Sequence, residues 1–307
     1  MGNSYAVERG TGSITGSQVC GALSEKTAYG IGLQAGQALL EEVYTTPKPG
    51  LVDLCSCGAH TDMNVHTFER SAQALTPYFI RMAYQGCMLS CSCEELFRQI
   101  RRTGLAAEQA MYRATDGVNT HKGLIFTLGI YCAAAGRCIA ERGRVTEQGV
   151  REIQQRMTVR ILTEELAGLR QREAVSHGEE NLHRYGTAGI RGEAIEGYRP
   201  VWEEALPVLR EGSRSREDSN SVKLQTLFVL MRQVDDSNIL ARRGPKTLGR
   251  VKREAADFLG KGGAYRADAI QELMEMDAEY SRQNISPGGS ADLLAAAVFL
   301  QKILERN

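Results

Sequence analysis

Apolar residues recur every three or four positions along most of this 307-residue chain. Side chains at that spacing share one face of an α-helix, so the pattern predicts amphipathic helices. The clearest stripes lie in residues 27–44, 66–84, 96–111, 150–161, 224–231 and 293–298. No sustained alternation of apolar and polar positions runs through the sequence, which argues against a doubly wound sheet. We therefore predict an all-α fold, a single compact bundle of about ten helices.

Residues 121–140 are apolar nearly all round, which predicts a helix buried at the centre of that bundle. Residues 26–307 are expected to form one helical catalytic domain, preceded by a flexible N-terminal segment at 1–25. Two polar segments interrupt the periodicity, at 170–187 and 211–221. The second has the composition of a mobile surface loop between helices.

Composition excludes several classes of protein. The chain has 37 basic and 37 acidic residues, so its net charge predicts neither nucleic-acid nor membrane binding. Aromatic residues make up only 6%, which disfavours a stacking platform for single strands. The first residues lack the apolar core of a signal peptide, and no apolar run reaches membrane-spanning length. We expect a soluble cytoplasmic protein.

Eight cysteines raise the question of a metal site, because five of them cluster in sequence. The cluster consists of Cys55, Cys57, Cys87, Cys91 and Cys93. Zinc could use such a set, but structural zinc sites are usually built on C-x2-4-C pairs. Two pairs in this cluster, Cys55 with Cys57 and Cys91 with Cys93, have the shorter C-x-C spacing. We expect reduced cysteines that serve as small buried apolar residues, and no zinc.

The densest polar chemistry lies in residues 45–68, where two prolines and a glycine stiffen the backbone. The segment contains Lys48, Asp53, His60 and Asp62. Loops usually carry permissive polar residues, so a stiffened loop with these reactive groups suggests a site. The alternative is a rigid turn with solvated charges.

Four further polar segments coincide with predicted helix ends. Asn119 or Thr120 can cap the central helix, and Lys122 adds a positive charge beside its free N–H groups. Arg191, in a glycine-rich lead into another helix, can bind phosphate through its guanidinium. The other two segments are 235–238 and 286–292. A cap with a nearby charge is usually only a cap, but five segments together supply what a magnesium-bound polyphosphate requires. The common phosphate-loop and dinucleotide-binding motifs are missing from the sequence.

Together these segments resemble one family, the triphosphoribosyl-dephospho-CoA synthases. The matching residues are 42–53 (EVYTTPKPGLVD), 58–63, 67–68, 117–123 (GVNTHKG), 191–194, 236–238 and 288–292, in family order over nearly the whole chain. Cys55-Ser56-Cys57 stands where the family commonly has Asn residues, and Asn64 where an acid is frequent. The first 25 residues match nothing.

The resemblance implies transfer of the triphosphoribosyl group of ATP to the 2′-hydroxyl of 3′-dephospho-CoA, with adenine as leaving group. It implies Mg²⁺ with ATP, and a product that an acyl-carrier-protein prosthetic-group transferase receives for citrate lyase or malonate decarboxylase. Such a reaction must protonate adenine, deprotonate the hydroxyl and shield a positive ribose carbon.

On this basis we assign candidate roles. The phosphate- and substrate-binding candidates are Lys48, Asn119, Thr120, His121, Lys122, Arg191, Asn238 and Ser290. The candidates for holding Mg²⁺ are Asp53, Asp62, Asp236 and Asp292. The catalytic candidates are Glu193, His60 and Asp236. Two alternatives remain open: a Mg²⁺-dependent hydrolase of N-glycosidic bonds of the ADP-ribosyl or nucleoside type, and a non-catalytic helical binding protein.

Overall fold

Helices make up nearly all of the chain, as the periodicity predicts. In this computed structural model, which describes residues 16–169, 174 and 177–305, 79% of the chain is helical and the described residues contain no strand. The elements are α1 (Gly16–Tyr44), α2 (Val65–Met88), α3 (Cys93–Ala114), α4 (Lys122–Arg142), α5 (Glu147–Leu169), α6 (His177–Tyr185), α7 (Gly189–Ile195), the π-helix η1 (Pro200–Ala205), α8 (Leu206–Ser215), α9 (Ser219–Gln233), α10 (Ser237–Gly260), the 3-10 helix η2 (Gly263–Tyr265), α11 (Ala269–Arg282) and α12 (Gly288–Glu305). The all-α prediction is confirmed.

The apolar helix α4 lies at the centre, packed against α1, α2, α3, α5 and α12. Glycines allow its closest approach to α2: a Cβ on Gly86 or Gly136 would lie 2.1 or 2.2 Å from a backbone carbonyl oxygen of the other helix. By length and composition α4 could cross a membrane, but 72% of its apolar window is buried inside the structure. It is therefore a core helix of the bundle, as predicted.

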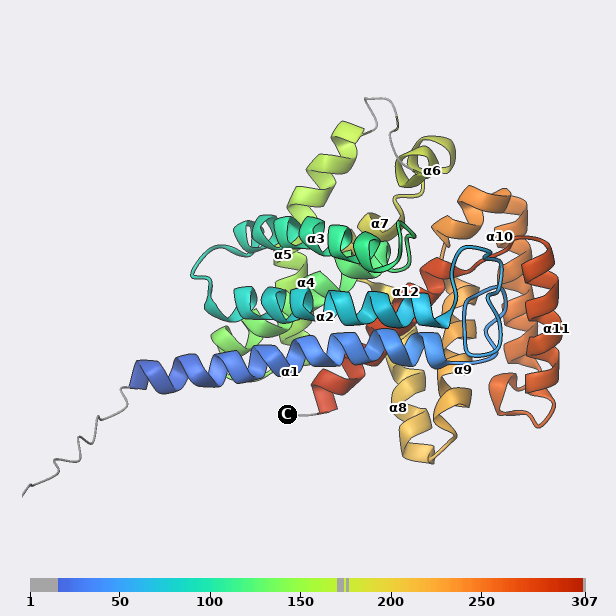
Figure 1. Cartoon of the computed structure of the whole chain (residues 1–307), viewed down its shortest axis with the longest axis horizontal. Coiled ribbons are helices and arrows are strands. Elements are labelled where there is room, and N and C mark those ends of the chain that lie inside the picture. The colour runs from blue at the N-terminus through green and yellow to red at the C-terminus, as the bar shows by residue number, and fades with distance from the viewer. Residues whose placement is uncertain (1–15, 170–173, 175–176, 306–307) are drawn as a thin grey trace, which may run out of the picture.

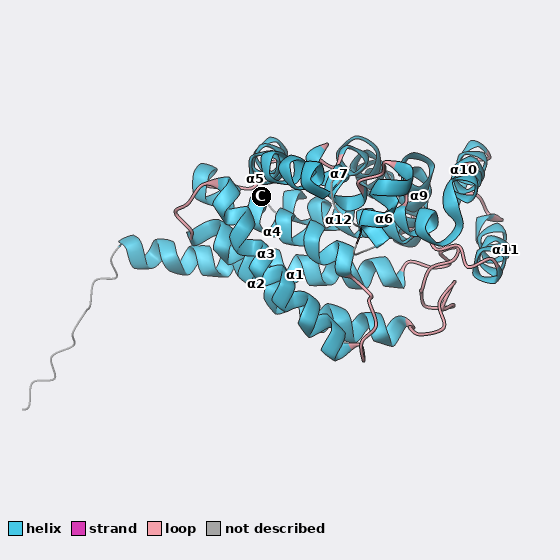
Figure 2. Cartoon of the chain, turned by 90° about the horizontal axis from the view of Figure 1, so that it is seen from above, coloured by secondary structure: helices cyan, strands magenta, loops and turns pink. Residues whose placement is uncertain are grey.

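The helices are arranged differently along the molecule and at its end (Figures 1 and 2). Helices α1 and α2 run side by side along it, while α10 and α11 stand at one end. The connection between α1 and α2, residues 45–64, lies beside α10 and α11 and is called the motif loop below.

Two segments differ from the sequence predictions. Most of residues 211–221 is helical, because α8 continues to Ser215 and the Asp218 carboxylate caps α9 by accepting the Ser221 N–H at 2.9 Å. The predicted mobile loop shrinks to three residues. Residues 16–25 form the first turns of α1, whereas 1–15 lie outside the described residues.

The described cysteines differ in burial. Cys93, Cys132 and Cys138 are buried, as expected for small apolar residues, and Cys87 and Cys91 are half-buried. Cys55 and Cys57 are exposed, so the expectation was wrong for them: they lie in a tight turn of the motif loop whose side chains face solvent. Within the described ranges no three His, Cys, Asp or Glu side chains are grouped as a metal site requires.

Candidate active site

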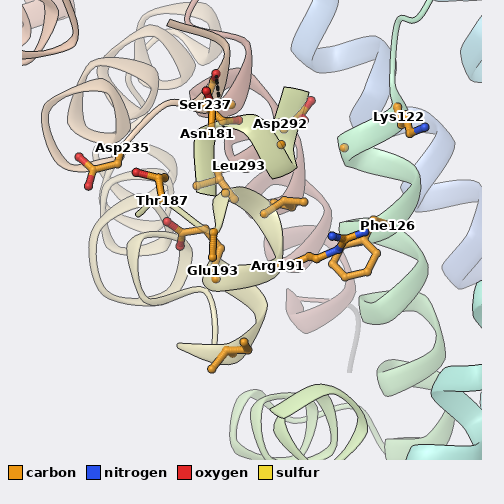
Figure 3. Close-up of a pocket in the computed structure, with 18 of the residues that line it drawn as sticks. Lys122, Phe126, Asn181, Thr187, Arg191, Glu193, Asp235, Ser237, Asp292 and Leu293 are labelled. Atoms are coloured by element: carbon orange, nitrogen blue, oxygen red, sulfur yellow. Dashed lines mark hydrogen bonds between the residues drawn. The ribbon is translucent and has the colours of Figure 1, made fainter. Parts of the chain in front are cut away.

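A cleft of about 1500 Å³ opens between α3, α4, α6, α7, the junction of α9 with α10, and the start of α12. Figure 3 shows its centre, with Lys122 and Phe126 on α4 facing the segments that carry Glu193, Asp235 and Asp292. Pockets for a single small ligand usually measure about 300–1,000 Å³. The cleft is large enough for two substrates side by side.

Among the described residues, Arg191 is the one basic side chain of this cleft without a carboxylate partner. Of the four basic residues that line it, three have carboxylate partners: Arg101 with Glu165, Lys122 with Glu108, and Arg199 with Glu203. Arg191 has no such partner within the described part of the chain, and its side chain reaches toward Phe126 in Figure 3. An unpaired guanidinium keeps its donors available for phosphate oxygens.

Carboxylates outnumber these cations. The acidic residues that line the cleft are Glu108, Glu179, Glu180, Glu193, Glu196, Glu203, Glu204, Asp235, Asp236 and Asp292. Ten acids against four bases leave an excess of negative charge, which repels a bare polyphosphate. An anionic ligand therefore fits best when divalent cations accompany it.

Glu193 lies in the short helix α7, two residues after Arg191. Its Oε2 atom is buried without a hydrogen-bond partner among the described residues. Burial raises the pKa of Glu193 to about 7; the carboxylates of Glu196 and Asp235 add to the rise, and Lys252 opposes it. A carboxyl group with this pKa exchanges a proton near neutral pH, as a general acid must.

Asp292, in the first turn of α12, lies directly against the start of α4. A Cβ on Gly123 would lie 2.1 Å from Asp292 Oδ2, so only glycine permits this approach. Burial raises the pKa of Asp292 well above its usual range, and the carboxylates of Glu42 and Asp236 raise it further. A cation bound here would stabilise the ionised carboxylate, so Asp292 fits a Mg²⁺-bearing substrate.

Asp236 joins α10 to α12. Its Oδ1 accepts the N–H groups of Asn238 and Ile239 at 3.0 and 3.4 Å, and its Oδ2 accepts the Ser290 N–H at 2.8 Å and hydroxyl at 3.1 Å. The side chain is only 1% exposed. Asp236 is thus the N-cap of α10 and a fixed part of the cleft wall. The carboxylate already accepts four hydrogen bonds, and a metal ion or substrate would have to compete with them for its oxygen atoms.

The motif loop is held by its own charged residues. Lys48 is fully buried, and its ammonium group contacts the Glu42 carboxylate and donates to the Glu42 carbonyl oxygen at 2.7 Å. Asp53 accepts three backbone N–H groups, from Lys48, Cys55 and Ser56, at 2.7 to 2.8 Å. Neither residue lines the cleft. Their polar groups are engaged in structural bonds here, and their contacts with phosphate and Mg²⁺ stay predictions.

His121 and Thr120 also belong to the core side of the wall. His121 is 1% exposed, and its Nδ1 lies 2.7 Å from the Ser71 hydroxyl, to which Thr120 donates at 2.8 Å. The ring meets Phe68 edge to face at 4.9 Å. Burial lowers the pKa of His121 to about 3, helped by the charge of Lys48, so this histidine is neutral. Its Nε2 atom is buried without a hydrogen-bond partner among the described residues, and His121 does not line the cleft.

His60 and Asp62 lie at the far end of the motif loop. His60 Nε2 is 3.1 Å from the Ser286 hydroxyl, and Arg242 donates to the carbonyl oxygen of Ala59 at 3.2 Å. Burial lowers the pKa of His60, and Arg242 lowers it further. The side chain of Asp62 is 61% exposed. Neither residue lines the cleft, so the structure does not bring them to Glu193.

The cleft thus collects half of the residues predicted from sequence. Those that line it are Asn119, Lys122, Arg191, Glu193, Asp236, Asn238 and Asp292. The sequence prediction gave no role to Asp235 or Glu108, which also line the cleft. Asp235 could have been found beside Asp236, whereas Glu108 carries no signal until folding pairs it with Lys122.

Comparisons with known proteins agree on one family. The sequence model for ATP:dephospho-CoA triphosphoribosyl transferase matches residues 28–307. A protein of Salmonella gallinarum named probable 2-(5''-triphosphoribosyl)-3'-dephosphocoenzyme-A synthase is 39% identical over 266 residues, 86% of this chain and 87% of the relative. The synthase of Escherichia fergusonii is 37% identical over 290 residues, 94% and 95% of the two chains. A probable synthase of Vibrio cholerae is 37% identical over 276 residues, 90% and 88% of the two chains. No solved structure matches the chain significantly.

Proposed function

The chain belongs to the ATP:dephospho-CoA triphosphoribosyl transferase family, and we propose that its cleft transfers the triphosphoribosyl group of ATP to dephospho-CoA. One observation carries the assignment of chemistry: α7 presents an unpaired cation, Arg191, and a proton-holding carboxyl, Glu193, to the same cleft. The volume of the cleft suits the two nucleotide substrates.

Arg191 binds the triphosphate, with Lys122 and the start of α4 as a second contact. Lys122 is less available because its ammonium group lies 3.1 Å from Glu108. Mg²⁺ enters with ATP, and its charge offsets the acidic lining of the cleft. Asp292 faces this ion or the ribose, since it has no hydrogen-bond or ion-pair partner among the described residues and stands among other carboxylates.

Glu193 acts as general acid on the departing adenine. Cleavage of the N-glycosidic bond leaves positive charge on the ribose and negative charge on the base, and a proton from the carboxyl group neutralises the base as it leaves. The carboxylate that remains then faces the positive ribose carbon and stabilises it. The 2′-hydroxyl of dephospho-CoA attacks that carbon, and its proton passes to a cleft carboxylate; Asp235 is the exposed candidate.

A direct test is release of adenine from ATP and Mg²⁺ with and without dephospho-CoA, followed by chromatography. We expect adenine in proportion to the acceptor added, together with triphosphoribosyl-dephospho-CoA. Adenine released without acceptor would favour the N-glycosidic hydrolase, for which the comparisons give no support. No adenine under either condition would leave only nucleotide binding and contradict the proposal.

The fate of the product is part of the same proposal. Triphosphoribosyl-dephospho-CoA has an activated triphosphate: attack by a carrier-protein hydroxyl at the α-phosphorus would break the α–β phosphoanhydride bond, release pyrophosphate and leave phosphoribosyl-dephospho-CoA on the carrier. The prosthetic group of citrate lyase or malonate decarboxylase is the destination that the sequence resemblance implies.

A further inference from the structure

Behind the wall that carries Glu193, four side chains bury polar atoms without hydrogen-bond partners among the described residues. They are Thr127 and Tyr131 on α4, Tyr198 just after α7, and Trp202 in the π-helix η1. The first three are fully buried, and Trp202 is 4% exposed. Buried polar groups are almost always paired with protein or water, so a set of orphans needs an explanation.

The four side chains form one cluster. The ring of Tyr131 lies 5.1 Å from that of Tyr198 and 5.9 Å from that of Trp202, measured between centroids. The Thr127 hydroxyl is close enough to that of Tyr198 to lower its pKa, against the larger effect of burial, which raises it. Two tyrosines, a threonine and a tryptophan thus bury their polar groups in one region of the core.

The backbone that brings Tyr198 and Trp202 there is unusual. Tyr198 has φ 52°, in the left-handed region that bulky residues rarely adopt, and Gly197 before it has φ 77°. The rare π-helix η1 follows at once. Strained residues and π-helical turns persist where other interactions hold them and are frequent at functional sites. This segment turns two polar aromatic side chains inward.

Glu193 connects the cluster to the cleft. The backbone N–H of Tyr198 donates to the Glu193 carbonyl oxygen at 2.7 Å, and Glu193 Oε2 is itself a buried atom without a partner. Burial raises the pKa values of Tyr131 and Tyr198, and the charge of the Glu193 carboxylate adds to the rise, so both hydroxyls remain neutral donors.

Other charged groups also face this carboxyl group. They are Glu196 on α7, Asp235 at the junction of α9 with α10, and Lys252 on α10. Arg151 on α5 lies over the Trp202 ring at 5.6 Å from its centroid. None of them hydrogen-bonds to Glu193 Oε2, which has no partner among the described residues.

We propose that Thr127, Tyr131, Tyr198 and Trp202 form a buried polar pocket, bridged by water, that orients the Glu193 carboxyl group for proton donation into the cleft. A buried water molecule needs two to four polar partners, and this pocket offers five atoms including Glu193 Oε2. Donors on Oε2 hold the carboxyl plane and leave the proton on Oε1 toward the substrate. The inference rests on the proposed acid role of Glu193.

The test compares matched variants at position 127. Thr127→Val keeps the shape of the side chain and removes the hydroxyl, whereas Thr127→Ser keeps the hydroxyl. We expect Thr127→Val to lower kcat about 10-fold, as expected when a general acid is poorly positioned, with the KM for ATP nearly unchanged. Loss of a donor destabilises the ionised carboxylate and so raises the pKa of Glu193. The fall of activity above neutral pH should therefore move to higher pH. Thr127→Ser should restore both quantities.

Tyr198→Phe is the second variant and should show the same pair of changes. Tyr280→Phe is its control, because Tyr280 is equally buried and donates to Glu254 Oε2 at 2.7 Å, in a part of the chain outside the cleft lining. The control should lose stability and keep the wild-type pH profile. Should Tyr198→Phe fail to fold, the pair at position 127 decides the question.

The variant Glu193→Gln distinguishes failure of the proposed acid role of Glu193 from failure of the pocket inference alone. If this variant keeps the wild-type activity and pH profile, Glu193 is not the acid, and both the proposed function of Glu193 and this inference fall. If it removes the alkaline limb while Thr127→Val and Tyr198→Phe leave kcat and the limb unchanged, the pocket is only structural. That second result overturns the inference alone.

Discussion

The motif loop and the cleft wall carry the same kinds of residue but use them differently. In the motif loop, Lys48 is paired with Glu42 and Asp53 is bonded to three backbone N–H groups. In the cleft wall, Arg191 and Glu193 have polar atoms without partners among the described residues. Paired groups stabilise a fold, and unpaired groups remain available for a ligand.

The motif loop contains one of the most specific stretches of the sequence, yet none of its residues lines the cleft. The loop lies against α10 and α11, where Gly50 donates to the Asp277 carboxylate at 2.8 Å and Arg242 contacts Ala59. It thereby supports α10, whose N-cap Asp236 forms part of the cleft wall. The loop acts on the site through the position of helices.

The largest effect should come from Glu193→Gln, which keeps the shape of the side chain and removes the acidic carboxyl proton. Loss of a general acid typically costs about 10²- to 10⁴-fold in rate, so kcat should fall by that amount with little change in the KM for ATP. Steady-state kinetics from pH 5 to 9 measure it. The wild-type rate should fall above a pH of about 7, and the variant should lack this limb. Glu164→Gln, at an exposed position on α5, is the control.

Lys48→Met should act on stability instead of chemistry. It leaves the Glu42 carboxyl buried without its cation, and breaking such a pair costs about 3–5 kcal/mol. Chemical denaturation should show this loss, while the folded fraction keeps the wild-type KM for ATP. The double variant with Glu42→Gln should recover part of the stability. A KM for ATP that rises strongly in a stable Lys48→Met protein would mean that Lys48 binds the substrate. It would contradict the difference between the motif loop and the cleft wall.

Arg191→Ala should weaken ATP binding without a loss of stability. A charge-assisted hydrogen bond contributes about 1.5–3 kcal/mol, so the KM for ATP should rise roughly 10- to 150-fold. Arg191 has no partner among the described residues that its removal would leave unsatisfied, so the thermal midpoint should stay close to that of the wild type. An unchanged KM would mean that the triphosphate lies elsewhere in the cleft.

Glu193→Gln should also change how stability depends on pH. The folded-state pKa is raised from 4.5 to about 7, so the native carboxyl keeps a proton that the unfolded chain releases. The wild type therefore loses stability as pH rises through this window, by at most about 3–4 kcal/mol. The glutamine variant should be the more stable protein at pH 8 and differ little at pH 4. Urea denaturation at the two pH values tests it, and equal differences at both would contradict the buried environment of Glu193.

Lys122→Ala should have the smallest effect of the series. Its ammonium group is already paired with Glu108, at 3.1 Å, and half exposed, so the KM for ATP should rise less than about 10-fold. The matched comparison is with Arg191→Ala under the same conditions. If the two variants raise the KM equally, pairing in the free protein does not predict which cation binds the triphosphate.

Local sequence determined most of the architecture. The spacing of apolar residues predicted the helices and the central position of α4, because a helix that is apolar all round can only be stable inside a bundle. Residues near helix ends were recognised in the same way: Asp236 was placed at a helix end and caps α10. The segments around Lys122, Arg191 and Asp292 were selected on chemistry, and they meet in the cleft.

Tertiary structure decided which of these groups are free to react. Lys122 is neutralised by Glu108, and Asp236 is bonded to Ser290, 54 residues away. Burial, with smaller contributions from charges on other segments, lowers the pKa of His121 to about 3 and raises that of Glu193 to about 7. The polar side chains behind Glu193 come from α4 and from residues 198–202 after α7, which no local pattern connects. Partners and solvent exposure depend on contacts between distant segments, so only the folded chain fixes them.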